Sequence, residues 1–244
     1  MVAIKIAEVT QYVEKNINGF HDGRLESLKR MRLNKILERK NPYLFKAKNI
    51  LLAQDLVSIL LDAYLSSQEE TIFGNFLEGL AIFINGKVYQ GWKSSTQGID
   101  LEFNKENTRY IVAIKSGPNW GNSSQVRKMR EDFRKAKQTI RTGNSGLHIV
   151  AVNGCCYGRN PTPDKGDYFK YCGQKFWEFI SGNSGLYLKI IQPLGYTARE
   201  KNDEFSEKYA QLINRFTLEF SETFVKNGAI DWEALVKFNS AVTN

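Results

Sequence analysis

Two strands joined by a short turn, in a chain that is otherwise largely helical, constrain the fold of this sequence most. Apolar and acidic residues alternate over Ile99–Phe103 with the period of two that a half-buried strand requires. After the polar stretch 104–108, the β-branched run 109–115 is typical of a buried strand, and it ends in Lys115. A loop then leads into an amphipathic helix, and strands interleaved with helices are typical of an α/β fold.

Helical patterns surround this strand pair. Residues 5–65 predict two helices separated by a break at Asn41-Pro42, and residues 71–83 predict a third. The later predicted elements are a turn at Asn85-Gly86, a strand over Lys87–Trp92, a helix capped by Ser123 or Ser124, a strand over Leu147–Val152, a helix over Tyr168–Ile180, a strand over Leu186–Ile191, and helices over Asp203–Val225 and Asp231–Phe238. This order predicts one α/β domain with a mixed sheet flanked by helices.

That single domain is expected to span residues 1–244. It would have a helical N-terminal part at 1–65, a core at 71–193 and C-terminal helices at 203–244. No apolar run reaches the ~18 residues of a membrane span, and no secretory leader is evident, so we expect a cytoplasmic protein with reduced cysteines. The chain has no Walker or dinucleotide-binding fingerprint, so no nucleotide cofactor is expected.

The charge balance favours an anionic partner. Lys and Arg number 34 against 26 Asp and Glu, a formal net charge of +8. The excess is concentrated in the predicted helix after residue 122, whose basic residues are Arg127, Lys128, Arg130, Arg134, Lys135, Lys137 and Arg141. Such a helix suits the tracking of phosphates, although a solvated charged face is the alternative.

Asp100 and Lys115 are the residues that most suggest chemistry. A turn centred near Glu106 sets Asp100 opposite Val112 or Ala113, so Asp100 and Lys115 can meet at one edge of the sheet. A carboxylate beside a lysine at a strand end can bind Mg²⁺ and orient a water that attacks a phosphodiester. The alternative is an ordinary cross-strand ion pair.

The loop after Lys115 is rich in small, polar and turn-forming residues. It can present backbone N–H groups and a helix N-terminus to a phosphate, although it can also be a surface turn. The residues predicted to contact double-stranded DNA are Ser116, Asn119, Trp120, Asn122, Ser123, Ser124, Gln125, Arg127, Lys128 and Arg130.

Three segments resemble the core of Type II restriction endonucleases of the PD-(D/E)XK superfamily: Gly98–Phe103, Ile111–Gln125 and Gly166–Gly182. The likeness covers about Thr71 to Pro193. Within the superfamily, the sequence is most similar to the group that cuts GGNCC-type sites. It implies a restriction-endonuclease-like fold, a homodimer, and Mg²⁺-dependent, sequence-specific double-strand cuts in DNA. It further implies that Asp100 and the carbonyl of Ile114 bind the metal and that Lys115 is the motif lysine.

Ala113 departs from this pattern, because the family usually has Glu or Asp two residues before the motif lysine. Glu78, on the helix before the sheet, is the first choice for the missing catalytic and metal-binding carboxylate; Glu102 and Glu131 are alternatives. Otherwise the chain is a weakened or inactivated nuclease, natural or substituted, that still binds DNA. An RNA-directed or repair nuclease on the same fold is a further alternative.

Overall fold

The computed structural model describes residues 3–143 and 146–242 and divides the chain into two compact units. Unit 1 comprises Met1–Ile17 and Phe73–Tyr196, and unit 2 comprises Asn18–Ile72 and Thr197–Asn244. Two long helices, α1 (Ile6–Arg30) and α4 (Ala53–Tyr89), contribute residues to both units. The single-domain organisation expected from the sequence stays a prediction.

Unit 1 contains a mixed sheet, as the sequence predicts. Among the described residues it has five strands in the order β1-β2-β3-β4-β5, with antiparallel pairing from β1 to β3 and parallel pairing from β3 to β5. The strands are β1 (Trp92–Lys93), β2 (Leu101–Lys105), β3 (Thr108–Lys115), β4 (His148–Cys155) and β5 (Phe169–Cys172). The helices of this unit, besides the parts of α1 and α4, are α5 (Ser123–Gly143), α6 (Gln174–Ser181), α7 (Leu186–Lys189) and α8 (Ile191–Leu194).

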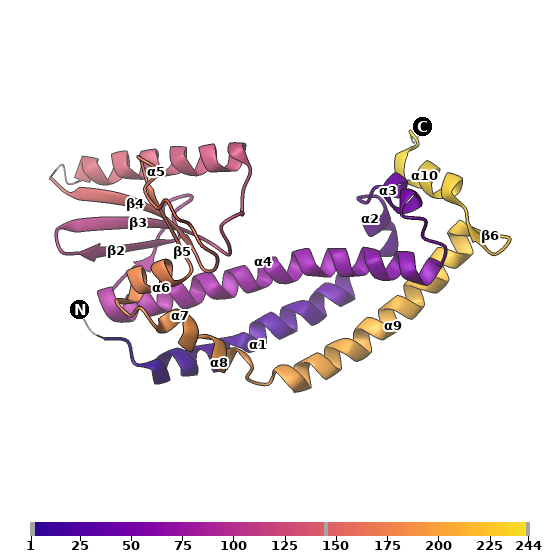
Figure 1. Cartoon of the computed structure of the whole chain (residues 1–244), viewed down its shortest axis with the longest axis horizontal. Coiled ribbons are helices and arrows are strands. Elements are labelled where there is room, and N and C mark those ends of the chain that lie inside the picture. Colours follow the sequence, from indigo (N-terminus) through magenta and orange to yellow (C-terminus); the bar gives the residue numbers. More distant parts are fainter. Residues whose placement is uncertain (1–2, 144–145, 243–244) are drawn as a thin grey trace. The chain divides into compact units, whose positions relative to one another are not determined.

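Helices cover both faces of this sheet. On one face, Ile111 and Ala113 of β3 pack in a cluster with Met129 and Phe133 of α5, which runs along the sheet in Figure 1. Because side chains alternate along a strand, the neighbouring residues point to the other face. There aromatic rings of β2, β3, β5, α4 and α6 contact one another in stacked, tilted and edge-on pairs that join Phe103, Tyr110, Tyr171, Tyr89 and Phe179.

The predicted turn at Asn85-Gly86 and the strand over Lys87–Trp92 are wrong. Helix α4 continues to Tyr89, because Leu80, Ile84 and Val88 bury one side of it at helical spacing. Asn85 is fully buried within this helix, and its side-chain amide donates to the carbonyl of Ile180 at 3.1 Å. Of the predicted strand, only Trp92 lies in a strand, as the first residue of β1. The sequence also predicts a gap between a helix that ends at residue 65 and one that starts at residue 71. The structure has no gap there, because α4 spans both.

Two later predictions are also corrected. The predicted helix over Tyr168–Ile180 is β5 followed by α6, because Gly173 adopts a φ of +53° between them and ends the strand. The predicted strand over Leu186–Ile191 is instead the two short helices α7 and α8.

Unit 2 is helical around its own apolar core, which includes Leu56, Leu60, Leu61, Phe216 and Phe220. Asn41 caps a helix here by accepting hydrogen bonds from two backbone N–H groups, which explains the predicted break at Asn41-Pro42. The unit adds α2 (Leu33–Leu37), α3 (Pro42–Ala47), α9 (Ala198–Phe224), the hairpin strands β6 (Val225–Lys226) and β7 (Ala229–Ile230), and α10 (Trp232–Ser240).

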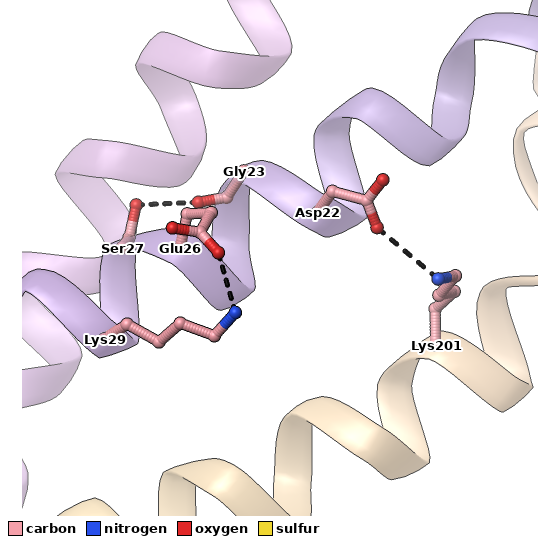
Figure 2. Close-up of polar contacts among 6 residues, drawn as sticks. All are labelled: Asp22, Gly23, Glu26, Ser27, Lys29 and Lys201. Atoms are coloured by element: carbon pink, nitrogen blue, oxygen red, sulfur yellow. Dashed lines mark hydrogen bonds and ion pairs between the residues drawn. The ribbon is translucent and has the colours of Figure 1, made fainter.

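Ion pairs lie on the surface of the helices of unit 2. Figure 2 shows Asp22 of α1 facing Lys201 of α9, with 3.4 Å between Oδ1 and Nζ. Glu26 and Lys29 pair within α1 at 2.7 Å. Exposed pairs of this kind contribute about 0–1 kcal/mol each, so the apolar core supplies most of the stability of the unit.

Candidate active site

Asp100 lies at the start of β2 and is fastened to β3. The register pairs Leu101 with Val112, which brings Asp100 opposite Ala113, as the turn position predicts. The backbone N–H of Asp100 donates to the carbonyl of Val112 at 2.9 Å. Its carboxylate Oδ2 accepts from the backbone N–H of Ile114 at 2.6 Å. One carboxylate oxygen is therefore anchored beside the residue that precedes Lys115, while Oδ1 is left to accept other bonds or bind a cation.

The carbonyl of Ile114 lies on the same side of β3 as this carboxylate. A strand residue directs its N–H and its C=O toward the same neighbouring strand, and the N–H of Ile114 points at Asp100. Asp100 and Ile114 therefore offer two oxygen donors, one charged and one neutral, on the side of β3 that faces the start of β2. Mg²⁺ is usually held by one or two carboxylates together with water and substrate phosphates, so this donor set fits the ion.

Lys115 is the last residue of β3, and its side chain lies beside Trp120, which hydrogen bonds fix to β4 and β3. Its ammonium nitrogen lies 5.3 Å from the centre of the Trp120 ring. The indole N–H of Trp120 donates to Oδ1 of Asn153 at 3.1 Å, and Nδ2 of Asn153 donates to the carbonyl of Ala113 at 3.2 Å. A cation over an aromatic face is attracted to it, so Trp120 holds the half-exposed lysine near the strand end.

Asn153 belongs to the candidate site but was not predicted from the sequence. It lies in β4, it is 1% exposed, and it links the loop after β3 to the backbone of Ala113. The signal was a single polar residue inside the apolar strand 149–155, because a buried amide needs partners and therefore fixes its neighbours.

Ala113 itself faces the apolar cluster beneath α5 and is fully buried. Its methyl group cannot ligate a cation. Among the residues that the structure describes, no group of three or more His, Cys, Asp or Glu side chains forms a candidate metal site. Position 113 therefore adds no carboxylate to the one that Asp100 supplies.

Glu78 lies on α4 near the ends of β3 and β4. Gly74, one turn earlier on the helix, packs closely on Ser116, since a Cβ at Gly74 would lie 3.7 Å from that of Ser116. Oε1 of Glu78 lies 3.5 Å from Nζ of Lys93. Burial raises the pKa of the Cys156 thiol, and the charges of Cys155 and, less strongly, Glu78 raise it further. No described contact joins Glu78 to Asp100.

The alternative carboxylates have other surroundings. Glu102 is buried, where it accepts from the hydroxyl of Ser94 at 2.6 Å and pairs with Arg109 at 3.2 Å. Glu131 is exposed among the arginines of α5. A further buried acid, Asp132, was not singled out from the sequence, because it falls within the apolar stripe of α5. Its carboxylate lies 2.6 Å from where a Cβ of Gly98 would be, two residues before Asp100.

The loop after Lys115 ends in a reciprocal helix cap. The N–H of Asn122 donates to Oε1 of Gln125 at 2.9 Å, and the N–H of Gln125 donates to Oδ1 of Asn122 at 3.0 Å. The cap of α5 is therefore Asn122, and the prediction of Ser123 or Ser124 is wrong. Both serines and Asn119 are exposed, so they remain accessible to a ligand, whereas the side chains of Asn122 and Gln125 already serve the helix.

The positive charge of α5 is only partly neutralised. Lys128 pairs with Asp132 at 2.7 Å. Arg130 pairs with Asp167 at 2.7 Å, which raises the pKa of the guanidinium. In the described part of the chain, no acidic side chain pairs with Arg127, Arg134, Lys135 or Arg141. The exposed side of α5 thus keeps a cationic surface of the kind that follows phosphates.

The thiols beside the site are not activated. Burial raises the pKa of Cys155 to about 12, against a smaller opposing effect of the Lys170 and Lys115 charges. Burial also raises the pKa of Cys156. Since the thiolate is the nucleophilic form, neither side chain is a nucleophile at neutral pH.

A mixed sheet between helices, with a carboxylate and a lysine at the ends of neighbouring strands, has the architecture of a restriction-endonuclease-like nuclease. Comparison with protein families identifies which family of nucleases the chain belongs to. The family described as Type II restriction endonuclease EcoO109I matches residues 7–202. The chain belongs to this family, whose members are site-specific deoxyribonucleases by class. No curated protein matches the chain. Within the described residues, no helix combines the length and the apolarity needed to cross a membrane.

Proposed function

We propose that the chain makes Mg²⁺-dependent, sequence-specific double-strand cuts in DNA by hydrolysing one phosphodiester bond in each strand. The main support for this proposal is the hydrogen bond from the backbone N–H of Ile114 to the carboxylate of Asp100, directly before Lys115. This hydrogen bond joins the carboxylate to the end of the strand from which Lys115 extends, which supports a shared task for the two side chains.

In this proposal each residue has a separate task. Asp100 and the Ile114 carbonyl hold Mg²⁺, which when bound lowers the pKa of a water and neutralises charge on the scissile phosphate. Lys115, held over Trp120, orients the attacking water and stabilises the developing negative charge. The exposed residues Asn119, Ser123 and Ser124 approach the DNA backbone.

A second carboxylate completes the metal site in this proposal, and Glu78 stays the first choice because α4 carries it to the ends of β3 and β4. Glu102 and Glu131 remain the alternatives. Arg127, Lys128 and Arg130 of α5 follow the phosphates on the same side of the sheet as the motif lysine.

We further propose that the active form is a homodimer that cuts a palindromic, GGNCC-like site. Two-fold symmetric sites pair naturally with two-fold symmetric proteins, and each subunit would then cut one strand. Sedimentation of the protein with a duplex that carries its site tests this, because two chains per duplex are expected. One chain per duplex contradicts the dimer without affecting the cleavage proposal.

Replacing the motif lysine separates cutting from binding. Lys115→Ala should lower the cleavage rate by at least ~100-fold, because one stabilising cation is lost from the transition state. DNA affinity in EDTA should change by less than ~5-fold, since the helix α5 is untouched. Cleavage of plasmid DNA with Mg²⁺ and a gel shift in EDTA give the two numbers.

Lys15→Ala is the matched control, because Lys15 is an exposed lysine on α1. It should cut and bind like the wild type. Undiminished cleavage by Lys115→Ala would refute the proposed site.

Ala113 favours a second candidate function, that of a nuclease-fold protein which binds DNA but cuts it weakly or not at all. The residue supplies no ligand at the position where the family usually has an acid. A sequence-specific shifted band that stays uncut in Mg²⁺ supports this candidate, whereas discrete fragments support the endonuclease.

A further inference from the structure

An open polar cleft of about 860 Å³ adjoins the candidate active site. It lies beyond the carboxyl ends of β4 and β5, between the segment 156–160 and the start of α6. Strands β3, β4 and β5 are parallel, so these ends share one edge of the sheet with Lys115. The crevice beyond the carboxyl ends of parallel strands is the usual place for a ligand in an α/β sheet.

The wall of this cleft is fastened to the loop that follows the motif lysine. The N–H of Cys156 donates to the carbonyl of Lys115 at 2.9 Å, and the N–H of Tyr157 donates to the carbonyl of Ser116 at 3.1 Å. Nζ of Lys170 donates to the carbonyl of Pro118 at 2.7 Å. These bonds hold the cleft at a fixed place beside the cutting centre.

Glycines allow the two loops to touch. The ring of Tyr157 occupies the space that a Cβ of Gly117 would need. A Cβ at Gly158 would lie 2.6 Å from Cδ of Pro118, and Gly158 has a φ of +90° that side chains rarely adopt. The cleft is therefore a preformed feature, since its backbone conformation is determined by close packing.

The side chains in the cleft have both signs of charge. Arg159 and Lys175 are positive, Glu178 is negative, and Gln174 offers an amide; all four are exposed. Nε2 of Gln174 donates to the carbonyl of Ser184 at 3.2 Å, which leaves its Oε1 as an acceptor. Among the described residues, neither Arg159 nor Glu178 has a side-chain hydrogen bond or ion pair.

This mixture fits base edges better than phosphates. A row of phosphates calls for positive side chains only, and a carboxylate would repel it. Base edges in the major groove present donors and acceptors together: guanine accepts from arginine through O6 and N7, and the cytosine amino group donates to a carboxylate. Arg159 and Glu178 are complementary to the two bases of one such pair.

We propose that this cleft reads base edges of duplex DNA beside the scissile phosphate, with Arg159, Gln174 and Glu178 as the reading side chains. The inference rests on the proposed endonuclease function, because it takes duplex DNA as the substrate of the adjoining site.

The test selects bound sequences from a pool of randomised duplexes in EDTA, where cleavage does not interfere. The wild type should enrich a defined sequence. Arg159→Ala should relax the preference at a guanine position, with a loss of discrimination of about 5- to 150-fold, while the preference elsewhere is retained. Glu178→Gln should relax a cytosine position by a similar factor.

Lys165→Ala is the control for the lost charge, because Lys165 is exposed on the segment before β5 and lies outside the cleft. It should leave every base preference unchanged. The proposal is overturned if Arg159→Ala weakens all sequences uniformly, which indicates a phosphate contact, or if the wild type enriches no sequence.

The two proposals fail separately. A protein that selects a sequence through Arg159 but never cuts supports the reading cleft and contradicts the endonuclease. A protein whose cleavage depends on Lys115, while its sequence preference ignores Arg159 and Glu178, supports the endonuclease and overturns the cleft.

Discussion

Ala113 shows how much one side chain decides at the residue scale. The backbone around it is held from both sides, since the carboxylate of Asp100 accepts from the N–H of Ile114 and Asn153 donates to the carbonyl of Ala113. The side chain at 113, however, packs in the apolar cluster beneath α5. The backbone conformation around position 113 therefore does not depend on which side chain is present. A substitution at this position tests only whether an added side chain can act as a metal ligand.

Ala113→Glu is the substitution that makes this test. In EDTA the buried carboxylate should cost roughly 3–5 kcal/mol of unfolding free energy, because it has no compensating charge. Mg²⁺ should restore much of that loss, and cleavage should rise if the natural chain is weakened. Thermal unfolding with and without Mg²⁺ measures the first effect, and plasmid cleavage measures the second.

Ala151→Glu provides the comparison, because Ala151 is buried in the same cluster on β4. Its destabilisation should be independent of Mg²⁺. Equal behaviour of the two variants would show that position 113 does not face the metal, and would favour a relocated acid such as Glu78.

At the scale of elements, the passage from β5 to α6 decides the shape of the cleft. Gly173 makes it possible with φ and ψ of 53° and −125°, and a Cβ there would lie 2.6 Å from the carbonyl oxygen of Gly158. No other residue type adopts this conformation without strain.

Gly173→Ala should accordingly lower the free energy of unfolding by about 1–3 kcal/mol. Gly185→Ala should change it by less than ~1 kcal/mol, because Gly185 has a φ of −94° and a Cβ there meets nothing closer than 3.5 Å. Urea denaturation of both variants gives the difference. Equal stability of the two would contradict the strained conformation at Gly173.

The sequence predicted those elements whose cause is local. The hairpin of β2 and β3 follows from alternation and a short polar turn, and α5 follows from its apolar stripe. The errors arise where distant contacts decide: the helix α4 runs through Asn85 because the carbonyl of Ile180 receives its amide. Likewise Asp100 and Lys115 were found from spacing, whereas Asn153 acts through partners on β3 and the following loop that spacing does not reveal.

At the scale of the whole molecule, the effect of the net charge of +8 on DNA binding depends on where the unpaired cations lie. Many basic residues are paired, as Lys237 is with Glu233 on α10 at 2.7 Å. Arg127, Arg134 and Arg141 of α5 are exposed and have no acidic partner among the described residues, so a DNA backbone can still neutralise them and binding should depend on them and on salt.

Arg127→Ala should reduce the slope of log affinity against log salt by about 1 and weaken binding of all sequences alike. Lys237→Ala should leave the slope unchanged, because its charge is already paired. Gel shifts over a range of salt concentrations measure both slopes. An unchanged slope for Arg127→Ala would place the DNA elsewhere on the protein.

The interlocked glycines have a consequence for any attempt to redirect this protein to new sites. The ring of Tyr157 fills the space beside Gly117, and Pro118 fills the space beside Gly158. The segments 116–118 and 157–158 therefore pack so closely that a change in the sequence of one requires a matching change in the other. Grafting from relatives should succeed when both segments are transplanted together, and a library that randomises only one of them should yield mainly misfolded or inactive proteins.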